Sequence, residues 1–260
     1  MSKDIASQLK SRGAVFAALV AMILAPSAYA ASPNNVTEEF HKTVSLNANG
    51  RVSLENVNGN VEITGWDRNE VQIDAVKSAR DQQRLDEAKI EVEGSGNSVS
   101  IRTRYPEGRT NNNPASVQYT LHVPRGAQLD KISLVNGSLN VAQISGEVNA
   151  SLVNGKITAH DLAGRAKLST VNGSVNAQYQ TLNNVSDVKI SSVNGSIDLK
   201  LPASPNAEIS ASSVNGGMSS DFPIQVQGKF MSHRMQGTLG NGGTRIELSN
   251  VNGSSHIGPV

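Results

Sequence analysis

The chain has 260 residues, with 23 Lys or Arg and 22 Asp or Glu, so its formal net charge is +1. This near balance excludes the concentrated positive field that is typical of nucleic-acid-binding proteins. The chain has no cysteine, which excludes a disulfide framework, so the fold must be held by burial and hydrogen bonds.

Residues 1–30 predict a cleaved signal peptide. Basic residues precede an apolar run of 12 residues at 14–25, and Pro26 ends this run. Ala28 and Ala30 then form the small-x-small pattern that a signal peptidase recognises. The run is too short for a membrane span, which needs about 20 apolar residues. We therefore expect cleavage after Ala30, a periplasmic or secreted mature protein, and no transmembrane anchor after cleavage.

Residues 31–125 predict a β-rich capping section with one short helix. Asp81 to Ala88 is the only convincing helical segment, and it is short and charged. Polar residues with two prolines make 106–114 a loop. Alternation of apolar and polar residues predicts strands in the remainder, at 43–78, 89–93, 98–104 and 117–123.

A repeated turn motif dominates residues 126–260. The tripeptide Val-Asn-Gly occurs seven times in the whole chain, and four successive copies from Val153 to Val214 are separated by 18, 22 and 21 residues. Additional glycines halve the period to nine residues between Gly137 and Gly173. Apolar residues alternate with polar ones on both sides of each turn, which indicates strands that bury one face.

Two architectures are compatible with this repeat. In a meander of hairpins, each Asn-Gly forms a tight turn between antiparallel strands. In a solenoid, coils of about 18–22 residues stack so that equivalent residues lie above one another. Val-Asn-Gly occupies only every second turn, and a solenoid accounts for this because its two corners differ. We therefore predict an all-β, single-stranded β-solenoid of the parallel β-helix type over 126–260. We expect an insertion at 221–243 to cover the open edge of the final coil.

The Asn-Gly pairs are the predicted structural sites. Glycine tolerates positive φ, and asparagine amides can bond to the equivalent amide one coil away. We also expect each strand to kink at the preceding valine and to turn that valine towards the core. The predicted turn ladder comprises Asn58, Gly59, Asn136, Gly137, Asn154, Gly155, Asn172, Gly173, Asn194, Gly195, Asn215, Gly216, Asn252 and Gly253.

The repeat resembles that of a known family. Val123-Pro124-Arg125-Gly126-Ala127 leads into Leu134-Val135-Asn136-Gly137-Ser138-Leu139, and Gly240-Asn241-Gly242-Gly243 precedes Val251-Asn252-Gly253-Ser254. These segments are similar to the bacterial putative-adhesin family of exported β-strand-repeat proteins, a domain of unknown function. The resemblance covers most of residues 44–258. It implies a fold and an exported location, and it carries no catalytic motif.

The sequence indicates no catalytic, cofactor or metal site, so we expect a protein that is not an enzyme and needs no cofactor. The five histidines show no metal-ligand spacing, and no Gly-x-Ser-x-Gly motif opens a helix. Carboxylates do not recur at one position of the repeat, which argues against a paired acid/base site. Glu147 and Arg165 lie 18 residues apart, so we expect an ion pair between adjacent coils.

Three hypotheses about function follow. The first is an envelope protein that acts as an adhesin or binding scaffold through outward rows of small polar residues (Ser151, Thr158, Ser169, Asn176 and Ser191). Its partner is unknown; a cell-envelope polymer, a surface glycan or a surface protein would suit it, whereas nucleic acid would not. The second is a structural or envelope-stress-related protein without its own ligand. A polysaccharide-active β-helix enzyme is a remote third, because a fold alone confers no activity.

Overall fold

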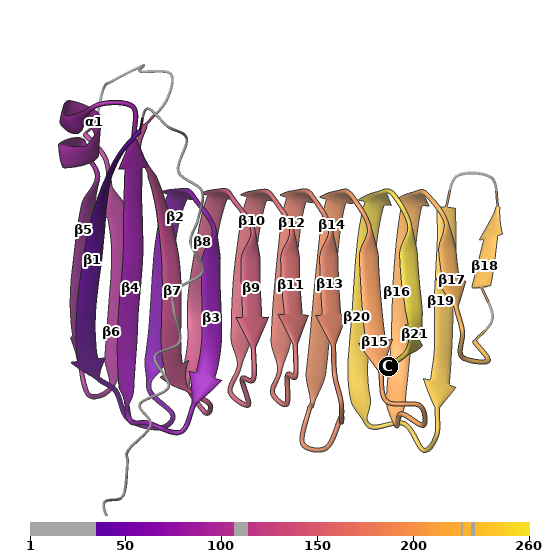
Figure 1. Cartoon of the computed structure of the whole chain (residues 1–260). Coiled ribbons are helices and arrows are strands. Elements are labelled where there is room, and N and C mark those ends of the chain that lie inside the picture. The colour runs from indigo at the N-terminus through magenta and orange to yellow at the C-terminus, as the bar shows by residue number, and fades with distance from the viewer. Residues whose placement is uncertain (1–34, 107–113, 225, 230–231) are drawn as a thin grey trace, which may run out of the picture. The chain divides into compact units, whose positions relative to one another are not determined.

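The computed structural model of the chain describes residues 35–106, 114–224, 226–229 and 232–260. All of these residues belong to one compact unit, Pro33–Val260. Their strands form a 10-stranded sheet, here sheet A, and an 11-stranded sheet, here sheet B, which lie face to face (Figure 1). The expected all-β class with two largely parallel sheets is confirmed. Ala28 and Ala30 of the expected signal peptide lie outside the described residues.

Within the described residues seven coils form the stack, and each places one strand in sheet B and the following strand in sheet A. A Val-Asn-Gly turn joins the two strands of each coil. The seven pairs are β2 (Arg51–Asn58) and β3 (Val61–Trp66), β8 (Gln128–Asn136) and β9 (Leu139–Ala142), β10 (Val148–Asn154) and β11 (Ile157–His160), β12 (Ala166–Asn172) and β13 (Val175–Gln178), β14 (Asp187–Asn194) and β15 (Ile197–Leu201), β16 (Ala207–Asn215) and β17 (Met218–Ser220), and β20 (Thr244–Asn252) and β21 (Ser255–Pro259).

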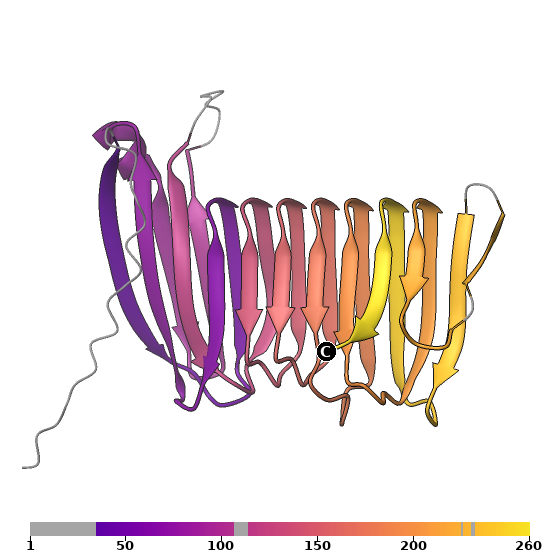
Figure 2. The same ribbon diagram turned by 45° about the vertical axis from the view of Figure 1, so that its right-hand side comes forward.

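Neighbouring coils pair in parallel and in register. Asn154 is opposite Asn136 on one side and Asn172 on the other. In sheet A, Ile157 is likewise opposite Leu139 and Val175. A meander of hairpins would instead pair successive strands antiparallel, so the meander is wrong for this region. Stacked coils make the arrangement solenoid-like, and the turns line up along one edge (Figure 2).

The N-terminal section extends both sheets beyond the first coil. Strands β6 (Ser98–Arg104) and β7 (Ser116–Pro124) lie parallel to β2 and β3. Antiparallel strands then complete each sheet: β5 (Lys89–Ser95) in sheet B, and β4 (Glu70–Ala79) and β1 (Val36–Ser45) in sheet A. The helix expected at 81–88 is α1 (Gln82–Glu87), and the carboxylate of Asp81 caps it by accepting a bond from Arg84 N. The coil β2–β3 is thus part of the stack, although it lies inside the section that we assigned to the cap.

The C-terminal coils do not stack in the order of the sequence. Strand β20 lies between β14 and β16, and β21 lies between β15 and β17. The last coil of the sequence is therefore inserted inside the stack, and β16–β17 is the outermost coil. Strand β19 (Ser232–Leu239) pairs antiparallel with the outer edge of β16, and β18 (Val226–Lys229) follows it. Part of the 221–243 insertion thus covers an end coil, but that coil precedes the insertion in the sequence.

Small aliphatic side chains fill the space between the sheets. The described core is a single cluster of buried Val, Ile, Leu and Ala with one methionine, Met235, and two buried tyrosines, Tyr119 and Tyr179. Each tyrosine hydroxyl has a partner: Thr103 Oγ1 at 2.7 Å for Tyr119, and the Gly164 carbonyl at 3.2 Å for Tyr179. Burial raises the pKa of Tyr119 to about 12. The hydroxyls are thus neutral hydrogen-bonding groups that allow large rings to enter a narrow core.

One residue of the repeat interrupts the apolar pattern, and the structure accounts for it. Asp130 occupies the position that is apolar in all six other copies, six residues before the turn Asn136. A β-bulge shifts the register there, so Leu129 pairs with Val148 and is buried, while Asp130 is exposed. The extra residue of the bulge lets the core stay apolar.

Candidate binding surface

The turn asparagines form a continuous ladder of amides. In six of the seven, the side-chain Nδ2 donates to Oδ1 of a neighbouring turn asparagine over distances of 2.8–3.1 Å, and Asn58 at the end of the ladder accepts from Asn136. In spatial order the ladder comprises Asn58, Asn136, Asn154, Asn172, Asn194, Asn252 and Asn215. Because each inner asparagine both donates and accepts, the ladder satisfies these amides along the whole corner.

The glycine after each asparagine has a conformation and a spacing that only glycine tolerates. In the middle of the stack, Gly155 has φ +148°, and a Cβ built on it would lie 1.9 Å from the Gly137 carbonyl oxygen. Its amide donates to the Asn172 carbonyl at 2.9 Å, and the same bond recurs between coils along the turn corner. The backbones of adjacent turns are therefore in direct contact, which explains the need for glycine at this position.

Buried polar side chains support the turns from inside. Two residues before the turn asparagine, some coils carry leucine, such as Leu134, whereas others carry a buried polar residue. Asn250 Nδ2 donates to the Gly195 carbonyl at 2.9 Å, and Ser192 Oγ donates to the Gly173 carbonyl at 3.1 Å. These side chains satisfy turn carbonyls that would otherwise be buried without partners.

The turn valines point outward, so our expectation that they face the core is wrong. Their exposed fractions run from 36% to 50% in the six copies after Val57. The inward position is the residue before the valine, and strand alternation continues unbroken to the turn. Several of these inward positions carry polar residues, such as Ser192. The alternation of buried and exposed residues therefore could not be recognised from the sequence there. In spatial order the exposed row is Val135, Val153, Val171, Val193, Val251 and Val214.

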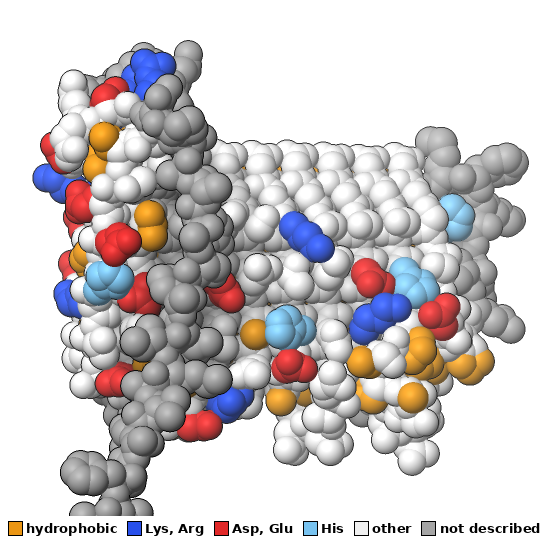
Figure 3. Space-filling model, viewed as in Figure 1, with side chains coloured by type: hydrophobic (Ala, Val, Ile, Leu, Met, Phe, Trp, Pro, Cys, Tyr) orange, Lys and Arg blue, Asp and Glu red, His pale blue; other side chains and the backbone are white. Residues whose placement is uncertain are grey.

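Three rows of side chains run in parallel beside the turn corner, and together we call them the Ser-Val-Asn strip. The valine row lies between the asparagine ladder and a row of outward serines. The serines are paired coil to coil: Ser133, Ser151, Ser169, Ser191, Ser249 and Ser212. Since strands lie about 4.8 Å apart, six coils extend the strip over about 24 Å. On the sheet A side, the border near the turns carries few charged side chains (Figure 3).

Most charged residues on the outer face of sheet B lie farther from the turns, whereas Glu55 of the first coil pairs with Ser133 and continues the serine row. The expected pair is confirmed, with Arg165 Nη2 at 3.6 Å from Glu147 Oε1. Lys189 lies 3.5 Å from Glu247. Near the first coil, the hydrogen bond from Lys131 lowers the pKa of the Glu55 carboxyl. Such exposed pairs contribute little to stability individually, and they leave the strip itself uncharged.

A Ser-His-Asp contact lies on sheet A near the outermost coil. Ser219 Oγ is 3.0 Å from His256 Nδ1, and His256 Nε2 is 3.3 Å from Asp221 Oδ2. These three residues have the composition of a hydrolytic triad. Hydrolytic activity also requires hydrogen-bond donors that stabilise an oxyanion. The backbone amides of Asp221 and Ser255 already donate to carbonyls of the neighbouring strand or turn. The contact ties β17 to β21, and we assign it no catalytic role.

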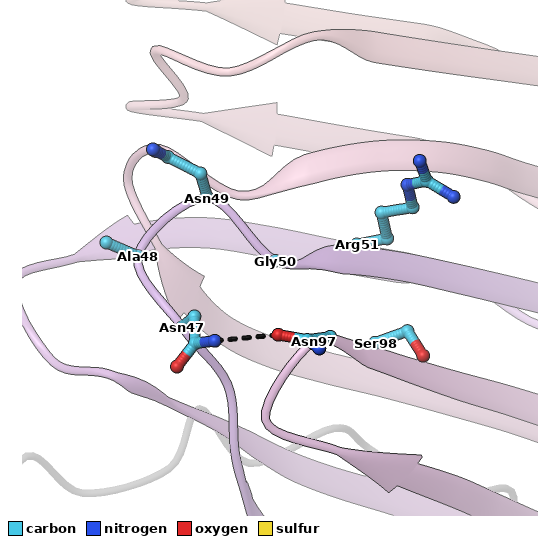
Figure 4. Close-up of a pocket in the computed structure, with 7 residues that line it drawn as sticks. All are labelled: Asn47, Ala48, Asn49, Gly50, Arg51, Asn97 and Ser98. Carbon is cyan, nitrogen blue, oxygen red and sulfur yellow. Dashed lines mark hydrogen bonds between the residues drawn. The ribbon is translucent and has the colours of Figure 1, made fainter.

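The described residues contain no cluster of three or more His, Asp or Glu side chains that could hold a metal ion. In the same residues, no helix is both long and apolar enough to cross a membrane. A surface depression lies at the opposite corner from the turns, and its lining includes Asn47, Asn49, Arg51, Asn97 and Ser98 (Figure 4). Asn47 Nδ2 donates to Asn97 Oδ1 at 2.8 Å, so this junction joins the β1–β2 turn to the β5–β6 hairpin.

The contribution of the amide ladder can be measured with Asn172→Ala. This change removes the bonds to both Asn154 and Asn194, and water can replace them because the ladder is exposed. We expect the free energy of unfolding to fall by about 1 kcal/mol. Urea denaturation followed by circular dichroism measures it. Asn140→Ala, which alters an exposed asparagine outside the turns, serves as control and should change stability by less than about 0.5 kcal/mol.

Comparison with known proteins agrees with the repeat. Residues 151–257 match the family model described as Toastrack DUF4097. The match confirms the resemblance to the bacterial putative-adhesin family that the turn motifs indicated. No curated protein matches the chain.

Solved structures that are similar to this chain include three bacterial proteins. A protein from Clostridium sporogenes, titled a putative cell adhesion protein, has 16% identity and a TM-score of 0.46, covering 86% of this chain and 100% of its own. A putative adhesin from Bacteroides fragilis has 13% identity and a TM-score of 0.41, covering 88% and 98%. A putative lipid binding protein from Parabacteroides distasonis has 13% identity and a TM-score of 0.33, covering 88% and 97%.

Proposed function

We propose that this protein is a non-enzymatic, exported envelope protein that binds an extended polymer along the Ser-Val-Asn strip. The exposed valine row is the observation that carries the proposal. Valine in such a row adds apolar surface to water without contributing to the core, and contiguous exposed apolar rows are typical of interaction sites. Export rests on the features of residues 1–30, which support a signal peptide.

The chemistry of the strip favours a repetitive polymer such as an envelope glycan. Hydroxyls of the serine row and amides of the asparagine ladder flank the valines, so polar and apolar contacts alternate across the strip. Sugar units also present hydroxyl groups beside apolar C–H faces. Because six neighbouring coils offer the same three side chains at about 4.8 Å intervals, weak contacts can add up along one ligand.

Retention on insoluble peptidoglycan, immobilised surface glycans and host matrix tests this proposal. The triple change Val153→Thr, Val171→Thr and Val193→Thr keeps the β-branched shape and removes the apolar row from the middle of the strip. We expect retention on the bound polymer to weaken about tenfold, because exposed apolar surface is lost from three coils. Melting curves should match those of the unaltered protein, since the changed groups are exposed.

Val76→Thr is the matched control, because Val76 is 38% exposed but lies on β4, away from the turns. It should leave retention unchanged. Failure of the unaltered protein to bind any of these polymers would contradict the proposal. A structural or envelope-stress role without a ligand would then be favoured, and altered envelope integrity after deletion of the gene would support it.

A further inference from the structure

The free edge of sheet A at the N-terminal end is formed by a long strand. Within the described residues β1 has a neighbour on one side only, β4, and it is 10 residues long. The strand at the other edge of the same sheet is β17, which has only three residues. A long free edge leaves a row of backbone N–H and C=O groups available for pairing with another chain.

The sequence of β1 is complementary to its own reverse. Reading outward from Phe40 in both directions, Glu39 corresponds to His41, Glu38 to Lys42, Thr37 to Thr43 and Val36 to Val44. Two copies paired antiparallel about Phe40 thus place acidic residues opposite basic ones, threonine opposite threonine and valine opposite valine. Opposite charges directly across antiparallel strands stabilise a pair, and like charges oppose it.

We propose that the partner of this edge is a second copy of the chain, with the two β1 strands antiparallel and Phe40 on the two-fold axis. The interface is isologous, as closed two-fold dimers require. Pairing from Val36 to Val44 forms about nine new backbone hydrogen bonds. It joins the two copies of sheet A into one continuous sheet.

The contacts within one copy are compatible with this pairing. Side chains of Val36, Phe40 and Val44 are partly buried against the core, so a second strand would cover their remaining surface. Lys42 Nζ bonds only to the Val92 carbonyl at 3.2 Å, among the described contacts, and is otherwise exposed. Glu38 Oε1 already lies 2.8 Å from Lys77 Nζ of its own copy, so Lys42 of the other copy would share this carboxylate with Lys77. This interface lies at the end of the stack and does not depend on the Ser-Val-Asn strip or its ligand.

Sedimentation velocity of the purified protein over a wide concentration range tests the dimer. Lys42→Glu places two like-charge pairs in the interface in place of two opposite-charge pairs. We expect its dimer dissociation constant to rise about tenfold. Lys167→Glu makes the same charge change on sheet B, far from β1, and should leave the constant unchanged. A protein that is monomeric at all concentrations, or a dimer that Lys42→Glu does not weaken, would refute the interface.

The absence of native cysteine allows the register to be tested directly. The proposed pairing puts Thr37 of one copy opposite Thr43 of the other, whereas the two Thr37 residues lie about 20 Å apart. An oxidised mixture of Thr37→Cys and Thr43→Cys proteins should therefore form a disulfide-linked heterodimer, and Thr37→Cys alone should form none. Cross-linking of Thr37→Cys with itself would show a different register or a parallel pairing, and would contradict the proposal.

Discussion

We expect Gly155→Ala to lower the free energy of unfolding by about 3–5 kcal/mol, one of the largest effects available from a single methyl group. The added Cβ would lie 1.9 Å from the Gly137 carbonyl oxygen, and φ at this residue is +148°. Alanine must therefore either adopt a strained backbone or push two turns apart. Separation of the turns would also break the bond from Gly155 N to the Asn172 carbonyl.

Gly217→Ala is the matched control for this prediction. Gly217 also lies in a turn, but a Cβ on it would meet no atom within 4 Å, so we expect a change of less than about 0.5 kcal/mol. Urea denaturation followed by circular dichroism compares the two. If both variants lost the same stability, contact between stacked turns could not explain why glycine follows each turn asparagine.

The spacing of the turn motifs was sufficient to predict that coils stack in parallel. A period near 18–22 residues with two kinds of corner is consistent with one strand in each sheet per coil. The pairing of Asn154 with Asn136 and Asn172 follows that expectation. Strand alternation was also sufficient to place most buried residues, because most inward positions of both sheets are aliphatic.

Two features could not be predicted, for different physical reasons. The orientation of the valines was missed because inward residues such as Thr170 and Ser192 are polar, and a buried hydroxyl resembles an exposed one in the sequence. Their partners, turn carbonyls of another coil, appear only in three dimensions. The Ser-Val-Asn strip was therefore not recognised as a unit, although its serine row was.

The order of the C-terminal coils was missed because the coils are chemically equivalent. The side chain of Asn194 can accept a hydrogen bond from the amide of either Asn215 or Asn252, since both turns present the same groups. The observed order depends on contacts outside the repeat: Thr244 Oγ1 donates to the Val185 carbonyl at 2.7 Å, and Arg245 N to the Ser186 carbonyl at 3.0 Å. These contacts anchor the start of β20 against the corner that precedes β14.

Insertion of β20 inside the stack leads to the second large prediction. Leu248 is 1% exposed and lies between Ile190 of β14 and Ala211 of β16. We expect Leu248→Lys to lower the free energy of unfolding by at least about 4 kcal/mol, because it buries an unpaired charge. Hydrogen exchange should show lost protection in β20 and β21, and also in β16 and β19, whose attachment to the stack runs through β20.

Ile209→Lys tests the same order of the C-terminal coils with a change in β16, the neighbour of β20. Ile209 is 3% exposed and lies between Ile246 of β20 and Gly237 of β19. Its replacement should release β16 and β19 while β20 stays protected, since β20 still pairs with β14. If the coils stacked in sequence order, the two patterns would be exchanged: Ile209→Lys would expose β20 as well, and Leu248→Lys would leave β16 protected. The comparison therefore separates the two topologies by which strands exchange together, whatever the size of the stability loss.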